Sequence, residues 1–330
     1  MQQVFQLGMG FIVSAALGTA IQFDIPEHLS GGPRTTADLA RTTGTDEDAL
    51  YRLLRALATV GVFAETSPRT FTLTRIGQLL RRGVPGGARE MVLWMCDAFH
   101  YRVYAEMPAA IQSGRAVGEK VVGMPVFEYL ARDAALAERF NNAMTAFSET
   151  VAPAALEAYD FSGITLLVDI AGGHGMILAS ILRKYPQMRG VLFDLEHVLA
   201  GNRLEEFGVK DRVQTAAGDF FREVPTGGDA YIMKHIIHDW DDEKAVVILK
   251  NIRRALEGKR DGRVILLETV VLPGNQPDMG KLIDLEMLLL PGGKERTADE
   301  FASLFERSGF ALTRIVPTQS PLSVVEARPK

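Results

Sequence analysis

The chain has 330 residues, of which 47% are apolar, so it can bury a large core and has the length of two domains. Its formal net charge of -5 provides no basic surface for nucleic-acid phosphates, which excludes nucleic acid as a main partner. The single cysteine, Cys96, excludes an internal disulfide framework and a thiolate metal site, and it favours a reducing, cytoplasmic compartment.

The first 23 residues carry no charged side chain, and the run from Gly8 to Phe23 resembles a signal or membrane segment. We reject a membrane partner, because no basic residues precede the run, glutamines interrupt it and it is short for a spanning helix. A helix that is apolar on nearly every face needs a covering surface. We therefore expect residues 1–22 to pack into a homodimer interface.

The next segment follows a winged-helix order. Thr35 predicts the start of a helix that ends at Gly44, and Thr45 predicts the cap of a second helix with a leucine stripe. Two alternating runs, 61–65 and 70–74, predict a hairpin. The second helix begins with acidic residues where a DNA reader would meet phosphates, so we favour a structural module over a DNA-binding domain.

Residues 88–150 are predicted to be helical and rich in aromatic and methionine side chains. Most of these are core residues, and a minority suits the wall of an apolar ligand pocket. The proposed acceptor-binding residues are Met95, Phe99, Met144, Phe147, Met287 and Leu290. The domain boundaries that follow are 1–85 for the winged-helix-like part, 86–155 for a helical linker and pocket wall, and 156–330 for the last domain.

From about residue 160 the pattern alternates between apolar strands and helices, which predicts an α/β domain with a doubly wound, mostly parallel sheet. Seven strands are expected, at 165–170, 190–195, 213–216, 230–234, 263–269, 311–316 and 323–327.

The first of these strands runs into a glycine-rich turn with the sequence VDIAGGHG. Gly172 and Gly173 let the backbone approach a ligand closely, and Asp194 ends the next strand, where a carboxylate can hold the ribose of an adenosine. A dinucleotide site would have G-x-G-x-x-G, but here the spacing is G-G-x-G and Asp169 would repel a pyrophosphate. Together with a third acidic strand end at Gly218-Asp219-Phe220, these residues favour S-adenosylmethionine over NAD.

Five motifs, in order, are VDIAGGHG, LFDLEHV, GDFFREVP, MKHIIHDWDDE and PGGKERT. Over nearly its whole length the chain resembles the small-molecule O-methyltransferases that act on caffeic acid, flavonoids, acetylserotonin, phenazines and polyketides. The resemblance implies a seven-stranded Rossmann-like sheet, an N-terminal dimerisation domain and S-adenosylmethionine as cofactor. The proposed cofactor-binding residues are Asp169, Gly172, Gly173, Asp194, Leu195, Gly218, Asp219, Phe220 and Lys234. Of these, the resemblance itself implies Gly172, Asp194, Asp219, Phe220 and Lys234.

The same resemblance makes His238 the general base and Glu268 and Glu295 the carboxylates that flank it. A phenol has an ordinary pKa of about 10, whereas an imidazole with a pKa of about 6.5 is mostly free to accept its proton. The expected substrate is therefore a small, hydroxylated and aromatic molecule.

Two residues depart from the family pattern: Ala171 replaces a glycine of the turn, and Leu290 replaces an asparagine near the substrate of the plant enzymes. His235 raises the alternative of a metal pair with His238, which we reject because no further ligands follow. Residues 239, 241, 242 and 243 are interpreted as the acidic start of a helix.

The alternative functions are decarboxylation or hydroxylation by a cofactor-binding relative, a winged-helix regulator that senses a small molecule, and an NAD-dependent oxidoreductase.

Overall fold

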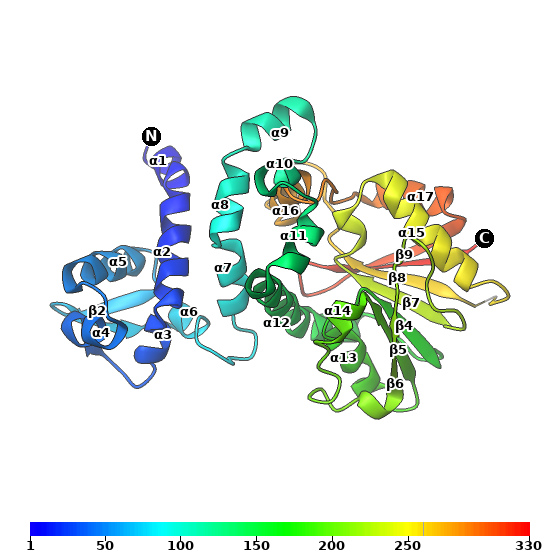
Figure 1. Ribbon diagram of the computed structural model, residues 1–330, viewed down its shortest axis with the longest axis horizontal. Helices are drawn as coiled ribbons and strands as arrows, with labels where there is room; N and C mark the ends of the chain where they lie inside the picture. Colours follow the sequence, from blue (N-terminus) through cyan, green and yellow to red (C-terminus); the bar gives the residue numbers. More distant parts are fainter. Residues whose placement is uncertain (260) are drawn as a thin grey trace. The chain divides into compact units, whose positions relative to one another are not determined.

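The computed structural model describes residues 1–259 and 261–330, which form two compact units (Figure 1). The first unit comprises Met1–Arg102 and Ala135–Phe147, and the second comprises Val103–Ala134 and Ser148–Lys330. The long helix α12 (Ala134–Ala158) contributes residues to both units.

The first unit has the predicted order of two helices and a hairpin. Helix α4 (Thr36–Thr43) begins as expected, with the Thr35 hydroxyl accepting from the backbone N–H of Asp38, and it ends at Gly44. Helix α5 (Glu47–Thr59) starts one residue later than predicted. The prediction of Thr45 as its cap is wrong, because Asp46 has the extended backbone of a cap and its carboxylate accepts from the N–H of Ala49. Strands β1 (Arg34–Thr35), β3 (Thr70–Leu73) and β2 (Phe63–Ser67) form a small antiparallel sheet in that order.

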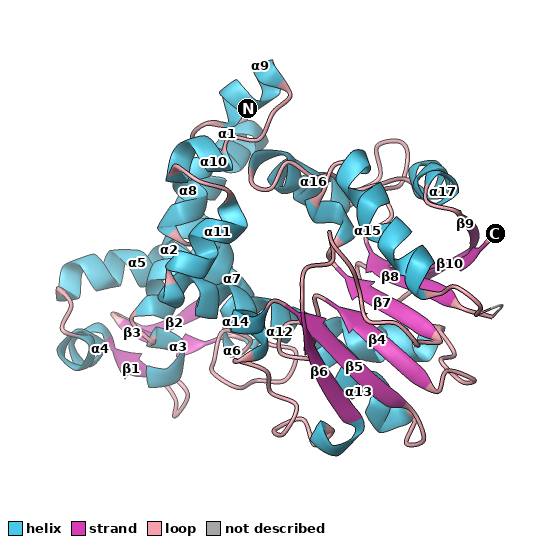
Figure 2. Ribbon diagram, turned by 45° about the vertical axis from the view of Figure 1, so that its right-hand side comes forward, coloured by secondary structure: helices cyan, strands magenta, loops and turns pink. Residues whose placement is uncertain are grey.

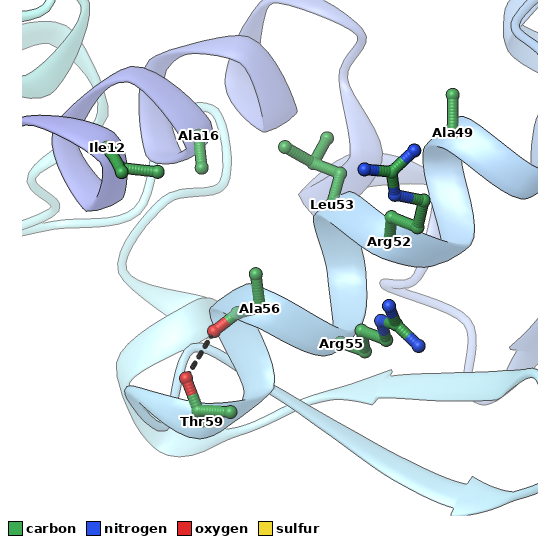
Figure 3. A pocket seen from close by; sticks show the side chains of 8 residues that line it. All are labelled: Ile12, Ala16, Ala49, Arg52, Leu53, Arg55, Ala56 and Thr59. Carbon is green, nitrogen blue, oxygen red and sulfur yellow. Dashed lines mark hydrogen bonds between the residues drawn. The ribbon is translucent and has the colours of Figure 1, made fainter. Parts of the chain in front are cut away.

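The N-terminal segment forms two helices, α1 (Gln2–Gly8) and α2 (Gly10–Gln22). Among its exposed apolar side chains are Val4, Phe5, Leu7, Met9, Phe11 and Ile12. An open groove of about 690 Å³ is lined by residues of α2 and α5, including Ile12, Ala16 and Leu53 (Figure 3). In the described residues no single helix combines the length and apolar character needed to cross a membrane; α1 and α2 meet these criteria only jointly, as a pair bent by 45°.

The second unit is built on a seven-stranded sheet with the order β6-β5-β4-β7-β8-β10-β9. All seven predicted strands are confirmed, within a few residues at their ends. They are β4 (Leu166–Ile170), β5 (Arg189–Asp194), β6 (Val213–Ala217), β7 (Ala230–Lys234), β8 (Arg263–Glu268), β9 (Phe310–Pro317) and β10 (Ser323–Pro329). The first five are parallel, and β10 runs antiparallel between β8 and β9.

Helices cover both faces of this sheet (Figure 2). Helices α15 (Asp242–Ala255) and α17 (Ala298–Arg307) share a core with Val168 and Ile170, on one face. Helix α13 (Met176–Lys184) packs on the other face, where Leu178 lies so close to Gly190 that a β-carbon there would come within 2.8 Å of it. Because both faces are covered, the central strands β4, β5, β7 and β8 are mainly apolar, and Asp169, Asp194, Lys234 and Glu268 lie at or near their carboxyl ends.

The remaining helices are short. They are α3 (Ile25–His28), α6 (Arg75–Gln78), α7 (Arg89–Met95), α8 (Ala98–Tyr104), α9 (Met107–Ser113), α10 (Gly118–Val122), α11 (Val126–Arg132), α14 (Glu196–Leu199), α16 (Gly280–Leu289) and the 3-10 turns η1 (Lys210–Arg212) and η2 (Ile237–Asp239).

One buried carboxylate joins the antiparallel edge of the sheet to the end of α12. Glu326 of β10 accepts hydrogen bonds from the hydroxyls of Tyr159 and Thr313 and from the guanidinium of Arg314. Burial works against the charged form, but these donors outweigh it and lower the pKa of Glu326 to about 2.

Candidate active site

Two residues of the glycine turn after β4 have unusual backbone surroundings: Ala171 has a strained conformation, and Gly172 lies close to neighbouring atoms. Ala171 has φ 54°, a left-handed backbone that costs a residue with a β-carbon about 1–2 kcal/mol. The position that departs from the family pattern is thus one that favours glycine. Gly172 allows a close approach, because a β-carbon there would lie 2.5 Å from Oδ2 of Asp169 and 2.5 Å from Leu192.

Two carboxylates flank this turn. Asp169 is buried, and its Oδ2 has no hydrogen-bond partner among the described residues. Burial, reinforced by the charge of Asp194, raises the pKa of Asp169 to about 7. Asp194 accepts from the backbone N–H of Gly173 at 2.9 Å and of Leu195 at 2.7 Å, which fixes the carboxylate and leaves lone pairs for further donors.

These groups fit a cationic adenosine cofactor. A cationic amine would pair with the unsatisfied oxygen of Asp169, and ribose hydroxyls would complete the bonding of Asp194. A pyrophosphate would instead meet two carboxylates, at a cost in free energy.

The third acidic strand end lies beside the second. Gly218 donates its backbone N–H to the carbonyl oxygen of Asp194 at 3.0 Å. Asp219 accepts from the N–H of Phe221 at 2.8 Å, and Phe220 packs against Phe221. The predicted adenine contacts of Asp219 and Phe220 stay predictions.

Lys234 ends β7 between the two groups of carboxylates. Burial lowers the pKa of Lys234 to about 8, even though the charges of Glu268 and Asp169 act in the opposite direction. One cation therefore interacts electrostatically with both the glycine turn and the residues around His238.

His238, Glu268 and Glu295, predicted as the catalytic group, lie together. Nδ1 of His238 is 2.7 Å from Oε1 of Glu295 and 3.9 Å from Oε2 of Glu268. Nε2 of His238 is 3.6 Å from Oδ1 of Asp239. The side chains of His238, Glu268 and Glu295 are buried and that of Asp239 is 16% exposed, so these charges interact in a medium that screens them weakly.

The electrostatics of His238 differ from the expectation. Burial lowers the pKa of His238, but Glu268, Asp239 and Glu295 outweigh it and raise the pKa to about 10. Burial raises the pKa of Glu268 to about 7 and that of Asp239 to about 6. The expectation of an ordinary imidazole pKa is wrong, because three carboxylates surround one ring.

The turn that carries His238 is held from two sides. Glu268 accepts from the backbone N–H groups of Ile236 and Ile237 through Oε1, at 3.1 and 2.9 Å. The buried guanidinium of Arg296 donates to the carbonyl oxygens of Ile237 at 3.0 Å and Trp240 at 2.9 Å. Both ends of η2 are therefore fixed.

The loop that carries Glu295 depends on Gly293. The backbone N–H of Lys294 donates to the carbonyl oxygen of His238 at 2.9 Å. A β-carbon on Gly293 would lie 1.9 Å from that same oxygen, so only glycine permits this approach. Asp284 accepts from the N–H of Glu295 at 2.8 Å and completes the support.

Sequence reasoning missed three residues of this site: His235, Asp239 and Arg296. Asp239 was assigned to the acidic start of α15; that is wrong, because it lies in η2 with its carboxylate toward His238, and the helix cap is Asp241. Direct adjacency to His238 was the available signal. For Arg296 the signal was a basic residue next to Glu295, and for His235 none existed beyond its spacing.

His235 lies directly after β7 with its ring stacked on that of His238, at 4.4 Å between centroids and 25° between planes. Ligand atoms of these two residues and Glu268 lie within 4.8 Å of one another. Imidazole lone pairs lie in the ring planes, so two stacked rings direct them to different points, which disfavours a shared metal ion.

The proposed acceptor-binding residues lie in different parts of the chain. Met95, Phe99, Met144 and Phe147 belong to the first unit, where Phe99 is buried and Met95 is exposed. Met287 of α16 and Leu290, its cap, are buried in the second unit. Their contact with an acceptor stays a prediction.

Comparison with known proteins agrees with this geometry. Residues 104–311 match the O-methyltransferase domain, and residues 5–83 match the O-methyltransferase dimerisation domain. The phenazine O-methyltransferase PhzM of Lysobacter antibioticus is 43% identical over 328 residues, which cover 99% of this chain and 95% of that protein.

Two further similarities bear on the chemistry. The crystal structure of CalO1, a methyltransferase of calicheamicin biosynthesis with bound S-adenosylhomocysteine, is 36% identical, covers 100% of this chain and 98% of its own, and has a TM-score of 0.87. Aclacinomycin 10-hydroxylase RdmB of Streptomyces purpurascens is 34% identical over 91% of this chain and 82% of its own length.

A seven-stranded sheet with this order and an acidic glycine edge defines the S-adenosylmethionine-binding methyltransferase fold. The chain belongs to the O-methyltransferase family and uses S-adenosylmethionine as its cofactor. The match to the dimerisation domain supports a homodimer.

Proposed function

We propose that His238 is the general base that takes the proton of an acceptor hydroxyl during methyl transfer. The observation that carries this proposal is the buried 2.7 Å contact between Nδ1 of His238 and Glu295. Because a carboxylate can only accept, Nδ1 carries the hydrogen once the ring is neutral, and Nε2 then presents a lone pair. His238 therefore has the tautomer that a base requires.

Bound S-adenosylmethionine supplies an electrophilic methyl group and a positive charge. Nε2 of His238 would accept the hydroxyl proton as the acceptor oxygen takes the methyl group and the methyl–sulfur bond breaks, which leaves the neutral thioether. Glu268, Glu295 and Asp239 stabilise the imidazolium that results, because Glu268 and Glu295 are buried beside it and Asp239 lies 3.6 Å from Nε2. An added positive charge lowers the pKa of an imidazole, so we expect His238 to lose its proton more readily in the loaded site than its pKa of about 10 indicates.

The proposed acceptor is a small aromatic molecule with a hydroxyl group, such as a phenol of phenazine or polyketide type. The name of the PhzM relative supports this class. The RdmB relative supports hydroxylation as the second candidate. The pair of His238 and Glu295 favours methyl transfer, because hydroxylation needs no base to deprotonate an acceptor.

The test is to incubate the purified protein with methyl-labelled cofactor and a panel of phenolic acceptors. We expect label in the product, and a loss of about 10²–10⁴-fold in kcat for His238→Gln. Calorimetry with S-adenosylhomocysteine should give the same Kd for both proteins, which shows that the cofactor site is intact. Wild-type rates in His238→Gln would contradict the base assignment, and unlabelled, oxygenated product would favour hydroxylation.

We further propose that the partner subunit covers α1, α2 and the groove of Figure 3, because α1 and α2 expose large apolar side chains such as Phe5 and Phe11, and Ile12 of α2 lines the groove. Phe11→Asp should shift light-scattering mass toward the monomer, whereas the exposed control Leu272→Asp should not. A wild-type protein that is monomeric at micromolar concentration would contradict this interface. The cytoplasm is the proposed compartment, on the ground of the single cysteine.

A further inference from the structure

The backbone of His235 has an unusual conformation for a residue directly after a strand. Its φ is 53°, and it is one of four non-glycine residues with a positive φ in the described ranges. Its N–H donates to the carbonyl oxygen of Leu267 at 3.1 Å, which extends the pairing of β7 with β8 by one residue. Strained backbone of this kind persists where the surroundings enforce it, and it concentrates at functional sites.

The result of this conformation is the stacked pair of imidazoles. The ring of His235 lies against the face of His238, while Glu295 holds the edge of His238 through Nδ1. Small changes in the side-chain torsions of His238 could still tilt its ring while this one hydrogen bond at Nδ1 is kept. A flat ring 4.4 Å away removes this freedom.

We propose that His235 is a positioning residue, whose ring fixes the plane of His238 so that Nε2 meets the acceptor hydroxyl. This inference rests on the proposed role of His238 as base. A neutral aromatic face also stabilises a cation that forms above it. His235 is suited to that, because burial and the neighbouring cations His238 and Lys234 hold its pKa well below the ordinary value.

The charged groups that act on this pair are Lys234 at the end of β7, Asp239 in η2, Glu268 at the end of β8 and Glu295 in the loop before α17. Glu286 in α16 acts on Asp239. None of the variants below alters any of them, so a change in the pH profile would report on the stacked ring.

The test compares two substitutions at position 235. His235→Asn removes the ring but tolerates the left-handed backbone, and His235→Phe retains a flat ring without nitrogen. We expect His235→Asn to lower kcat about tenfold or more and to displace the acid limb of the kcat pH profile, with the acceptor KM, the Kd for S-adenosylhomocysteine and Tm close to wild type. We expect His235→Phe to retain most of kcat and the wild-type profile.

The proposal would be overturned by a wild-type kcat and pH profile in His235→Asn. It would also be overturned if His235→Phe, with a Tm close to wild type, were impaired as much as His235→Asn, since a ring nitrogen rather than the stacked face would then be needed. A loss confined to KM would make His235 an acceptor contact instead. His238→Gln, measured alongside, separates this inference from the base assignment: if that variant keeps its activity, the base itself is wrong.

Discussion

Substitution of Gly293 by alanine perturbs the pair of His238 and Glu295 without changing either side chain. The added β-carbon would lie 1.9 Å from the carbonyl oxygen of His238 and 2.6 Å from the backbone nitrogen of Trp240. Both contacts are with backbone, which cannot rotate away. The Glu295 loop and the His238 turn must therefore move apart.

The required movement can be worked out from the structure. Ordinary carbon–oxygen contacts begin at about 3.3 Å, so the loop must withdraw by about 1.4 Å. An equal displacement of Glu295 would lengthen its 2.7 Å contact with Nδ1 of His238 to about 4 Å, beyond hydrogen-bond range. A misplacement of about 1 Å in a catalytic group costs about 10²-fold in rate, and overpacking costs about 1–3 kcal/mol of stability.

Kinetics with a phenolic acceptor and calorimetry with S-adenosylhomocysteine measure this effect. Gly293→Ala should lose about 10²-fold in kcat while its Kd for the cofactor product stays near wild type, because the glycine turn after β4 is untouched. The matched control is Gly31→Ala, whose β-carbon meets nothing within 4 Å and whose kcat should not change. A Gly293→Ala enzyme with wild-type kcat would refute the claim that this close approach positions Glu295.

Three further predictions follow from the same geometry. Glu268→Gln keeps the oxygen that accepts from two backbone N–H groups but removes a negative charge. The pKa of His238 should therefore fall from about 10, and the acid limb of the kcat pH profile should move to lower pH. An unchanged profile would contradict the electrostatic assignment. Ala171→Gly relieves a left-handed backbone and should stabilise the chain by about 0.5–1 kcal/mol in denaturant titration, whereas Ala200→Gly, at φ −59°, should destabilise it. Because the pKa of Glu326 is lowered in the folded state, this carboxylate stabilises the fold above its ordinary pKa near 4.5, and the effect is lost as pH falls toward about 2. Glu326→Gln should therefore be less stable than wild type at pH 6, with a difference that shrinks toward pH 2. A difference that stays constant with pH would contradict this.

Much of the fold was predictable because apolar periodicity, turn residues and helix caps are local features of the sequence. The seven strands are apolar runs between turns, and Thr35 and Gly44 bound α4 through short-range hydrogen bonds. The prediction of the α5 cap was wrong because Thr45 and Asp46 are adjacent and either residue type can cap a helix. Only the backbone geometry identifies Asp46 as the cap.

The residues of the site were predictable where they belong to sequence motifs of the family. His238, Glu268 and Glu295 were found in this way, although they come from three separate segments. The pKa of His238 was not predictable, because it depends on distances to three carboxylates in a buried site. The stack of His235 on His238 depends on a single left-handed residue, which no periodicity reveals.

The proton transfer to His238 is tested most directly by a series of phenolic acceptors of decreasing pKa. If His238 takes the acceptor proton, the ratio of wild-type to His238→Gln rates should be about 10²–10⁴ for phenols near pKa 10 and should approach one for phenols already ionised at the assay pH. A ratio that stays constant across the series would contradict the account.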